Sequence, residues 1–155
     1  MNKTVEQSKT EHIQIIMAEH INGYDRLFGG RLMEWIDIVA GVVARRHTGM
    51  NVTTVCVDNL VFKAAAKINE LVLLTGRVTY VGNTSLEVRV DTYVEHGDGT
   101  RNMVNRAYIV MVALDENERP AKVPGLIMQT EAQRLEWEAG EKRAQLRKQR
   151  RIQGY

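Results

Sequence analysis

An aspartate stands in the middle of an otherwise apolar segment of this 155-residue chain. Between Arg31 and Arg46, apolar residues fall on almost every face of a predicted helix, which is the pattern of a buried helix. Asp37 lies at its centre, and a carboxylate in such surroundings is costly unless it is paired or used in chemistry. A structural role, in which Asp37 only holds a neighbouring loop by hydrogen bonds, fits the pattern equally well.

Two glycines and an asparagine precede the same helix. Gly29 and Gly30 leave its first N–H groups unobstructed at the positive end of the helix dipole, where an oxyanion or a phosphate can bind. Asn22, seven residues before Gly29, carries a short polar side chain that can reach back towards the helix start. Both features also occur in ordinary turns, because Asn-Gly and Gly-Gly are common turn pairs.

The segments that must position these residues have the residue pattern of β-strands. Apolar and polar residues alternate from Val52 to Leu114, which predicts half-buried strands. Gly82 and Asn83 indicate a tight hairpin, and the sheet is predicted to be a largely antiparallel meander around the helix, an α+β fold. The predicted strands are an edge strand at His12–Met17 and then Val52–Phe62, Leu71–Val81, Thr84–Val94 and Met103–Leu114.

The C-terminal segment carries the excess positive charge. From Thr130 onward there are seven Lys or Arg and four acidic residues, whereas the rest of the chain is close to neutral. A charged helix is predicted from Thr130 to about Gln149, packed on a neighbouring subunit or solvated. The basic cluster Arg147, Lys148, Arg150 and Arg151 could attract polyanions, but no aromatic residue interrupts it and the domain is not basic. We therefore expect neither a nucleic acid nor a membrane as partner.

Length and composition favour one globular domain. The chain has 44% hydrophobic and 26% charged residues, and about 150 residues make one domain. Cys56 is the only cysteine, so no intrachain disulfide forms, and no Cys/His cluster predicts a metal site. Met1–Thr10 lacks the apolar core of a signal peptide, and the longest apolar run, Ile38–Ala44, is too short to span a bilayer. A cytoplasmic location is expected.

The order of these motifs resembles the hotdog-fold acyl-CoA thioesterases of the bacterial YciA and mammalian brain acyl-CoA hydrolase type. The resemblance covers roughly His12 to Pro124. It divides the chain into a polar leader (1–11), a hotdog domain (12–124) and a basic C-terminal helix or tail (125–155). The matching segments are Asn22–Gly41 with its Phe-Gly-Gly and Asp37, Ala44–His47, Thr54–Asp58, Phe62 and Gly82–Ser85.

The resemblance implies hydrolysis of fatty acyl-CoA to free acid and coenzyme A. Asp37 would be the general base or the nucleophile, Asn22 would orient water or the thioester, and the Gly30 N–H would polarise the thioester carbonyl. Thr54 would support the site, although an ordinary strand threonine explains it as well. The Asn and the Asp of one site would come from opposite subunits of a homodimer, commonly assembled as a trimer of dimers. No separate cofactor is implied, since coenzyme A belongs to the substrate.

Contacts to coenzyme A are also implied by the resemblance, with a solvated helix end and an ordinary turn as the alternatives. The residues concerned are Arg45, Arg46 and His47 at the helix C-terminus and Asn83, Thr84 and Ser85 in the hairpin. The chain departs from many relatives where Phe62 is followed by Lys63-Ala64-Ala65 instead of a Phe-x-x-Pro segment, and where Asn69-Glu70 replaces Gly-Asp. These departures bear on the local loop path and on acyl-chain selectivity.

Two other hotdog functions compete with hydrolysis. A protein that binds acyl-CoA without cleaving it would keep the fold and the coenzyme A contacts, but the presence of both Asp37 and Asn22 argues against it. Hydroxyacyl dehydratases use a histidine in a His-Phe-Pro-Gly context, and none of the four histidines has these neighbours.

Overall fold

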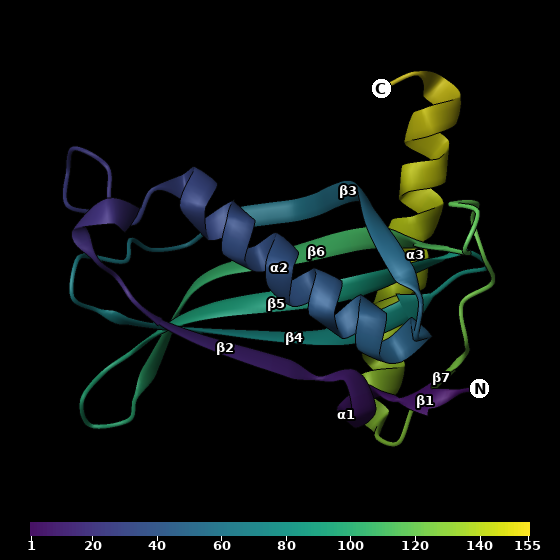
Figure 1. Cartoon of the computed structure of the whole chain (residues 1–155), viewed down its shortest axis with the longest axis horizontal. Helices are drawn as coiled ribbons and strands as arrows, with labels where there is room; N and C mark the ends of the chain where they lie inside the picture. The colour runs from purple at the N-terminus through teal and green to yellow at the C-terminus, as the bar shows by residue number, and fades with distance from the viewer.

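The computed structural model describes all 155 residues as a curved sheet with one long helix on its concave face and a second long helix on its outer face (Figure 1). The short elements lie near the N-terminus and before the last helix. The elements are β1 (Lys3–Thr4), α1 (Val5–Ser8), β2 (Thr10–Ile15), the 3-10 turn η1 (Ala18–His20), α2 (Gly29–Thr48), β3 (Asn51–Phe62), β4 (Leu71–Val81), β5 (Ser85–Glu95), β6 (Arg101–Leu114), β7 (Leu126–Ile127) and α3 (Glu131–Gln153).

The main sheet has five antiparallel strands in the order β2-β4-β5-β6-β3. The predicted α+β architecture and the edge position of the first long strand are confirmed. The predicted meander is wrong for one strand. β3 precedes β4 in the sequence, but it pairs with β6 at the opposite edge of the sheet from β2. The chain crosses from one edge to the other between Phe62 and Leu71, so both outer strands, β2 and β3, have one side without a strand partner.

Helix α2 buries one face against the sheet. Val39 and Val43 lie against Gly76 of β4, where an added Cβ would come within 2.7 Å of a Val39 methyl group, so glycine permits the close approach of helix and strand. The prediction of a helix buried all round is wrong, because Met33 and Ile38 are 46% and 55% exposed. The physical reason is that a single sheet can cover only one side of a helix, so the opposite apolar face is left for another surface.

The N-terminal leader is paired with the segment that follows the sheet. Lys3 and Thr4 form a parallel bridge with Leu126 and Ile127, and α1 begins at a capping box built by Thr4. The side chain of Val5 is 2% exposed. The leader is therefore anchored on the domain through its strand pairing and Val5, whereas Met1 is fully exposed.

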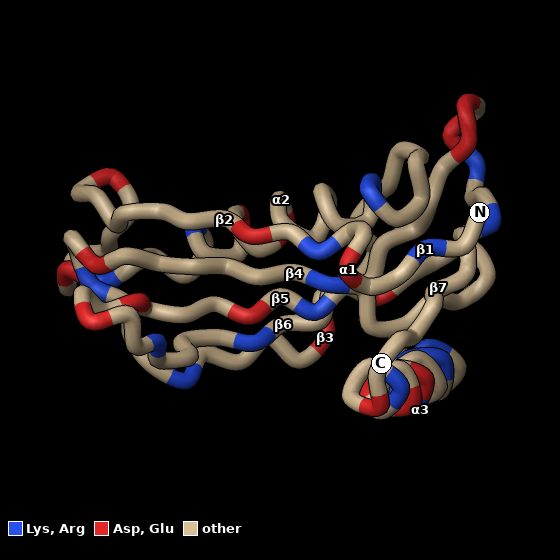
Figure 2. Tube along the Cα trace, turned by 90° about the horizontal axis from the view of Figure 1, so that it is seen from below, with Lys and Arg blue, Asp and Glu red and all other residues tan.

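Helix α3 lies across the outer face of the sheet at one end of the molecule (Figures 1 and 2). Trp137 stacks on Tyr80 of β4 with ring centroids 4.6 Å apart. Gly140 sits so close to Tyr80 that an added Cβ would come within 2.7 Å of the Tyr80 Cβ. The helix therefore packs on its own sheet, which neither predicted arrangement anticipated.

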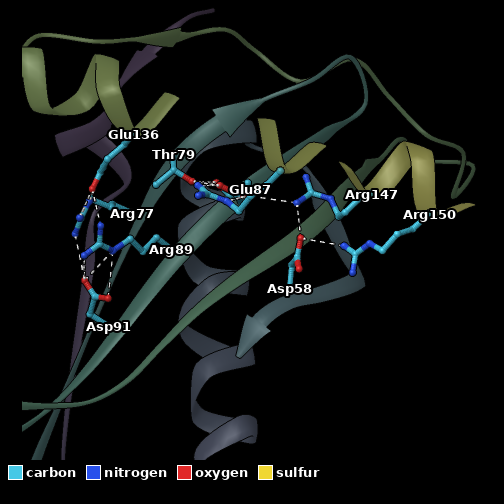
Figure 3. Close-up of polar contacts among 10 residues, drawn as sticks. Asp58, Arg77, Thr79, Glu87, Arg89, Asp91, Glu136, Arg147 and Arg150 are labelled. Atoms are coloured by element: carbon cyan, nitrogen blue, oxygen red, sulfur yellow. Dashed lines mark hydrogen bonds and ion pairs between the residues drawn. The ribbon is translucent and has the colours of Figure 1, made fainter. Parts of the chain in front are cut away.

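Buried ion pairs hold α3 in this place (Figure 3). Glu87 of β5 is 1% exposed and accepts hydrogen bonds from Arg143 at 2.8 and 3.0 Å. Arg147 donates to Asp58 of β3 at 3.1 Å and to Glu87 at 3.3 Å, and Arg150 donates to Asp58 at 3.3 Å. Two members of the basic cluster are thus neutralised by carboxylates of the sheet. Neither α3 nor any other helix is long and apolar enough to cross a membrane.

Candidate active site

Asp37 projects from the exposed face of α2 towards the edge strand β3. The Thr54 hydroxyl donates a hydrogen bond of 2.6 Å to Asp37 Oδ1. Within the single chain the carboxylate is exposed, so the expectation of a buried acid does not hold for one subunit alone. With Oδ1 bound to Thr54, Oδ2 has no partner in the chain and can accept a proton or a hydrogen bond from a ligand.

The N-terminus of α2 presents free amide groups. The first hydrogen bond at this end runs from the Leu32 N–H to the Phe28 carbonyl at 3.1 Å. The helix begins at Gly29, so both glycines lie in its first turn, where N–H groups have no intrahelical acceptor. The Phe28 ring lies over Gly30, and a Cβ there would come within 2.7 Å of the ring. Glycine therefore keeps this terminus open to an oxyanion.

Asn22 shapes the loop that leads into α2. Its Oδ1 accepts hydrogen bonds from the N–H groups of Tyr24 at 2.9 Å and Arg26 at 3.3 Å, a local turn that helps Asp25 adopt a φ of 59°. The loop is tied to the helix start by the Phe28 N–H, which donates to the His20 carbonyl at 2.8 Å. The side-chain NH₂ of Asn22 makes no hydrogen bond within the chain, so it is the part of Asn22 that a ligand can use.

A hollow of about 480 Å³ opens beside Asn22 and Gly29. Its inner wall consists of Leu32, Ala66 and Val104, each at most 3% exposed. The outer wall includes Phe62 and the small residues Ala64 and Ala65, with Arg26 and Lys63 also lining the hollow. An apolar chain fits such a space better than a charged group does.

The structure does not bring Asn22 and Asp37 together in one chain. Asn22 lines the hollow at the start of α2, whereas Asp37 lies two turns further along the helix and does not line it. At 1.5 Å per residue, Gly30 and Asp37 are separated by about 10 Å along the axis. Of the predicted catalytic residues, Asp37 and Thr54 form one group, and Asn22 and Gly30 form another.

The basic residues at the C-terminus of α2 differ in availability. The side chain of Arg45 makes no hydrogen bond or ion pair, and it lines a groove of about 790 Å³, which Asp115 and Glu116 also line. Arg46 lines the same groove but donates to the Lys9 carbonyl and the Thr10 hydroxyl, both at 3.1 Å.

His47 is fully buried, and its Nε2 lies 2.8 Å from the Pro124 carbonyl oxygen. Burial lowers the pKa of His47 below its usual 6.5, although the hydrogen bond to Pro124 opposes the shift. The ring is therefore neutral and faces the interior, and it offers coenzyme A no contact in this structure.

The hairpin between β4 and β5 uses its backbone rather than its side chains. The Thr84 carbonyl accepts from the Ala113 N–H at 3.0 Å, and the Asn83 carbonyl accepts from the Val123 N–H at 2.8 Å. The side chains of Asn83, Thr84 and Ser85 make no hydrogen bond within the chain, so their amide and hydroxyl groups are free.

Sequence reasoning missed only the inner wall of the hollow. Leu32, Ala66 and Val104 have the pattern of ordinary core positions, whereas the segment after Phe62, which also lines the hollow, was linked to acyl-chain selectivity from the sequence. Phe28 was recognised only as part of a motif, and its place over Gly30 depends on the turn of the loop.

Known proteins match this chain over most of its length. The model of the Thioesterase superfamily matches residues 24–100. The uncharacterised acyl-CoA thioester hydrolase YkhA of Bacillus subtilis is 32% identical over 146 residues, covering 94% of this chain and 85% of that protein. The chain belongs to the hotdog-fold acyl-CoA thioesterases. The cytosolic acyl coenzyme A thioester hydrolase of Rattus norvegicus is 30% identical over 144 residues, but this thioesterase spans 38% of its length.

Solved structures agree with this assignment. The acyl-CoA hydrolase of Staphylococcus aureus, solved in complex with butyryl coenzyme A, superposes with a TM-score of 0.94 at 27% identity, covering 99% of this chain and 94% of that one. An apo-hexameric acyl-CoA thioesterase superposes with a TM-score of 0.92 at 31% identity, covering 97% of both chains. The resemblance noted from the sequence is confirmed, and the chain is an acyl-CoA thioester hydrolase by family.

Proposed function

We propose that this protein hydrolyses acyl-CoA thioesters in a site built by two subunits, with Asp37 from one subunit and Asn22 and the Gly30 N–H from the other. The observation that carries the proposal is the carboxylate of Asp37, held by Thr54 on a helix face that has no cover in the single chain. A base so placed needs a second surface to bring it the thioester and to exclude water.

The surroundings of Asp37 favour a second copy as that surface. Met33 and Ile38 on α2 are about half exposed, and Val55 and Val57 on β3 are 54% and 46% exposed. The free edge of β3 adds unpaired backbone groups to this apolar face. An exposed apolar face beside an open strand edge is typical of a subunit interface. A two-fold axis beside Asp37 would cover both and carry the partner's helix start towards the carboxylate.

Positions altered in a relative support the choice of residues. Solved variants of the Staphylococcus aureus acyl-CoA hydrolase replace an asparagine, an aspartate or a threonine by alanine, and successive positions are separated by 15 and 17 residues. Asn22, Asp37 and Thr54 have the same residue types in the same order at the same separations. The three residues therefore correspond to positions chosen for study in an acyl-CoA hydrolase that shares this fold.

The chemistry follows from these groups. Asp37 Oδ2 accepts a proton from a water molecule while the water oxygen attacks the thioester carbonyl carbon, a step for which a placed base contributes about 10²–10⁴ in rate. The carbonyl oxygen becomes negative and is stabilised by the Gly30 N–H, and one such donor is worth about 10²–10³. The C–S bond then breaks, and the proton held by Asp37 passes to the departing thiolate, which gives free acid and coenzyme A.

The remaining parts of the substrate have candidate sites. The hollow beside Asn22 takes the acyl group, because most of its lining residues are apolar and it lies next to the proposed carbonyl position. Arg45 and Arg46 at the end of α2, together with the free side chains of Asn83, Thr84 and Ser85, are the proposed contacts to coenzyme A. His47 is buried and cannot make such a contact. By analogy with the hexameric relatives, we propose that three such dimers assemble into a hexamer.

Release of free thiol from a panel of acyl-CoAs tests the proposal. The wild type should turn over at least one chain length, and Asp37→Asn should lower kcat by about 10²–10⁴ because it removes the base. Asp37→Asn keeps the size of the side chain, and Glu34→Gln, on the same exposed side of α2, is the matched control that should keep full activity. Saturable coenzyme A binding without turnover by the wild type would favour an acyl-CoA-binding protein instead.

A further inference from the structure

The loop that carries Asn22, residues 21–28, is held at its base by a buried histidine. His20 is the last residue of η1 and is 6% exposed, whereas residues 22–26 are all exposed. The chemistry proposed above does not use His20. A buried imidazole is costly unless its nitrogens are hydrogen-bonded, so its partners indicate what it is there to hold.

Two hydrogen bonds join His20 to both ends of the loop. Its Nδ1 accepts from the Met17 N–H at 3.0 Å, and its carbonyl accepts from the Phe28 N–H at 2.8 Å. Because Nδ1 is an acceptor here, the ring proton is on Nε2. The first bond fixes the chain where it leaves β2, and the second fixes the residue that precedes α2.

The ring of His20 also sets the position of the loop relative to α2. Its edge faces the ring of Trp35, with centroids 5.0 Å apart and planes at 80°. Trp35 is 6% exposed and lies two residues before Asp37 on α2. Aromatic rings in this arrangement have a preferred geometry, so the contact restricts how the loop sits on the helix.

We propose that His20 is a positioning residue for Asn22, which acts through the Nδ1 acceptor and through the contact of its ring with Trp35. The inference rests on the site proposed above, in which Asn22 of one subunit and Asp37 of the other act on the same thioester. Their relative placement then depends on where each subunit holds its loop on α2. A displacement of about 1 Å in such a site can cost about 10²-fold in rate.

A second attachment of the loop does not involve the side chain of His20. The Leu27 N–H donates to the Ala66 carbonyl at 2.8 Å, and the Ile68 N–H donates to the Asp25 carbonyl at 3.1 Å. These backbone bonds remain when the His20 side chain is replaced. A substitution at His20 should therefore shift the loop without unfolding the domain.

Steady-state kinetics of His20→Phe test the inference. Phenylalanine keeps an aromatic ring beside Trp35 but gives the Met17 N–H no acceptor. The value of kcat should fall by about tenfold or more while KM stays within about threefold, because Asn22 is misplaced for the reaction rather than for binding. His12→Phe is the matched control and should keep full activity, since His12 also lies beside Trp35, at 6.5 Å, but makes no side-chain hydrogen bond to the loop.

His20→Asn separates positioning from general stability. The Oδ1 of asparagine is bonded to Cγ, as the Nδ1 of histidine is, so it can accept from the Met17 N–H. The kcat of His20→Asn should therefore be at least about threefold higher than that of His20→Phe. A merely structural histidine would give no such rescue, because asparagine fills less of the space beside Trp35 than phenylalanine does.

Amide hydrogen exchange gives a readout that does not need catalysis. The N–H groups of Tyr24 and Arg26, which donate to Asn22 Oδ1, should exchange about tenfold faster or more in His20→Phe and at the wild-type rate in His12→Phe. His20→Leu, which also lacks the acceptor, takes the place of His20→Phe if circular dichroism shows that His20→Phe does not fold.

Wild-type kcat and wild-type loop exchange in folded His20→Phe would overturn the inference, and so would equal losses of kcat in His20→Phe and His20→Asn. A wild type without hydrolase activity, in which His20→Phe speeds loop exchange and His20→Asn restores it, would contradict the proposed function and leave the hold of His20 on the loop standing.

Discussion

Replacing Arg147 by methionine should destabilise the protein through the buried charges that α3 covers. Arg147 is 8% exposed and is shared by Asp58 and Glu87, which are 7% and 1% exposed. Removing one member of a buried ion pair costs about 3–5 kcal/mol, because the other charge remains buried. Glu87 keeps Arg143 and a 2.7 Å hydrogen bond from Thr79, so the lower end of that range, about 3 kcal/mol, is expected.

Urea unfolding at one fixed protein concentration measures this effect, since the subunits associate. In thermal unfolding, a loss of about 3 kcal/mol should lower the Tm by roughly 6–12 °C, at about 2–4 °C per kcal/mol for a chain of this size. Lys148→Met, an exposed neighbour on α3, is the control and should change stability by less than about 0.5 kcal/mol. An Arg147→Met variant as stable as the Lys148→Met control would refute the reasoning, because α3 would then not be held on the sheet by these ion pairs.

Three further changes have defined outcomes. Burial lowers the pKa of His47. As the pH falls below about 6.5, His47 therefore takes up a proton in the unfolded chain but not in the folded one, and the free energy of unfolding falls by up to about 1.4 kcal/mol per pH unit. His47→Gln should lose this dependence in urea unfolding at about pH 7 and about pH 5.5, and an unchanged slope would contradict the neutral ring. Ala65→Leu narrows the hollow and should reduce kcat/KM for the longest acyl-CoAs accepted while sparing the shortest; equal losses at all lengths would place the acyl group elsewhere. Gly140→Ala should cost about 1–3 kcal/mol, because its Cβ would overlap Tyr80, and a wild-type Tm would show that α3 sits further from the sheet.

The strands and the long helix could be predicted because their patterns are local. Alternation identified β3 to β6, and Thr130 marked the start of α3, where its hydroxyl accepts from the Gln133 N–H at 3.1 Å. The pairing of β3 with β6 could not be predicted in this way, since alternation shows which residues share a face and does not show which strand lies alongside. The same limit applies to α3, which was predicted to be solvated or packed on a neighbouring subunit. The partners of its Glu136 and Arg147 lie on distant strands, and local sequence does not reveal them.

In the candidate site, too, features set by local sequence could be predicted, and features that depend on distant residues could not. The placement of Asp37 on α2 followed from its neighbours, and the free amides at Gly30 followed from the two glycines. The burial of His47 did not, because its ring packs in the interior and is hydrogen-bonded to the carbonyl of Pro124, which is 77 residues away. The hollow beside Asn22 depends on how the segment after Phe62 returns to the helix, a path that local sequence does not determine.

Mixing two inactive variants tests most directly whether two subunits build the site. Asp37→Asn and Asn22→Ala subunits should each be inactive alone, and after subunit exchange in equal amounts thiol release should recover to roughly a quarter of the wild-type rate, because half of the dimers are mixed and one site in each has both groups. Exchange is verified by mass spectrometry of differently labelled subunits. Absence of recovery despite complete exchange would place Asp37 and Asn22 in the site of a single subunit and contradict the account.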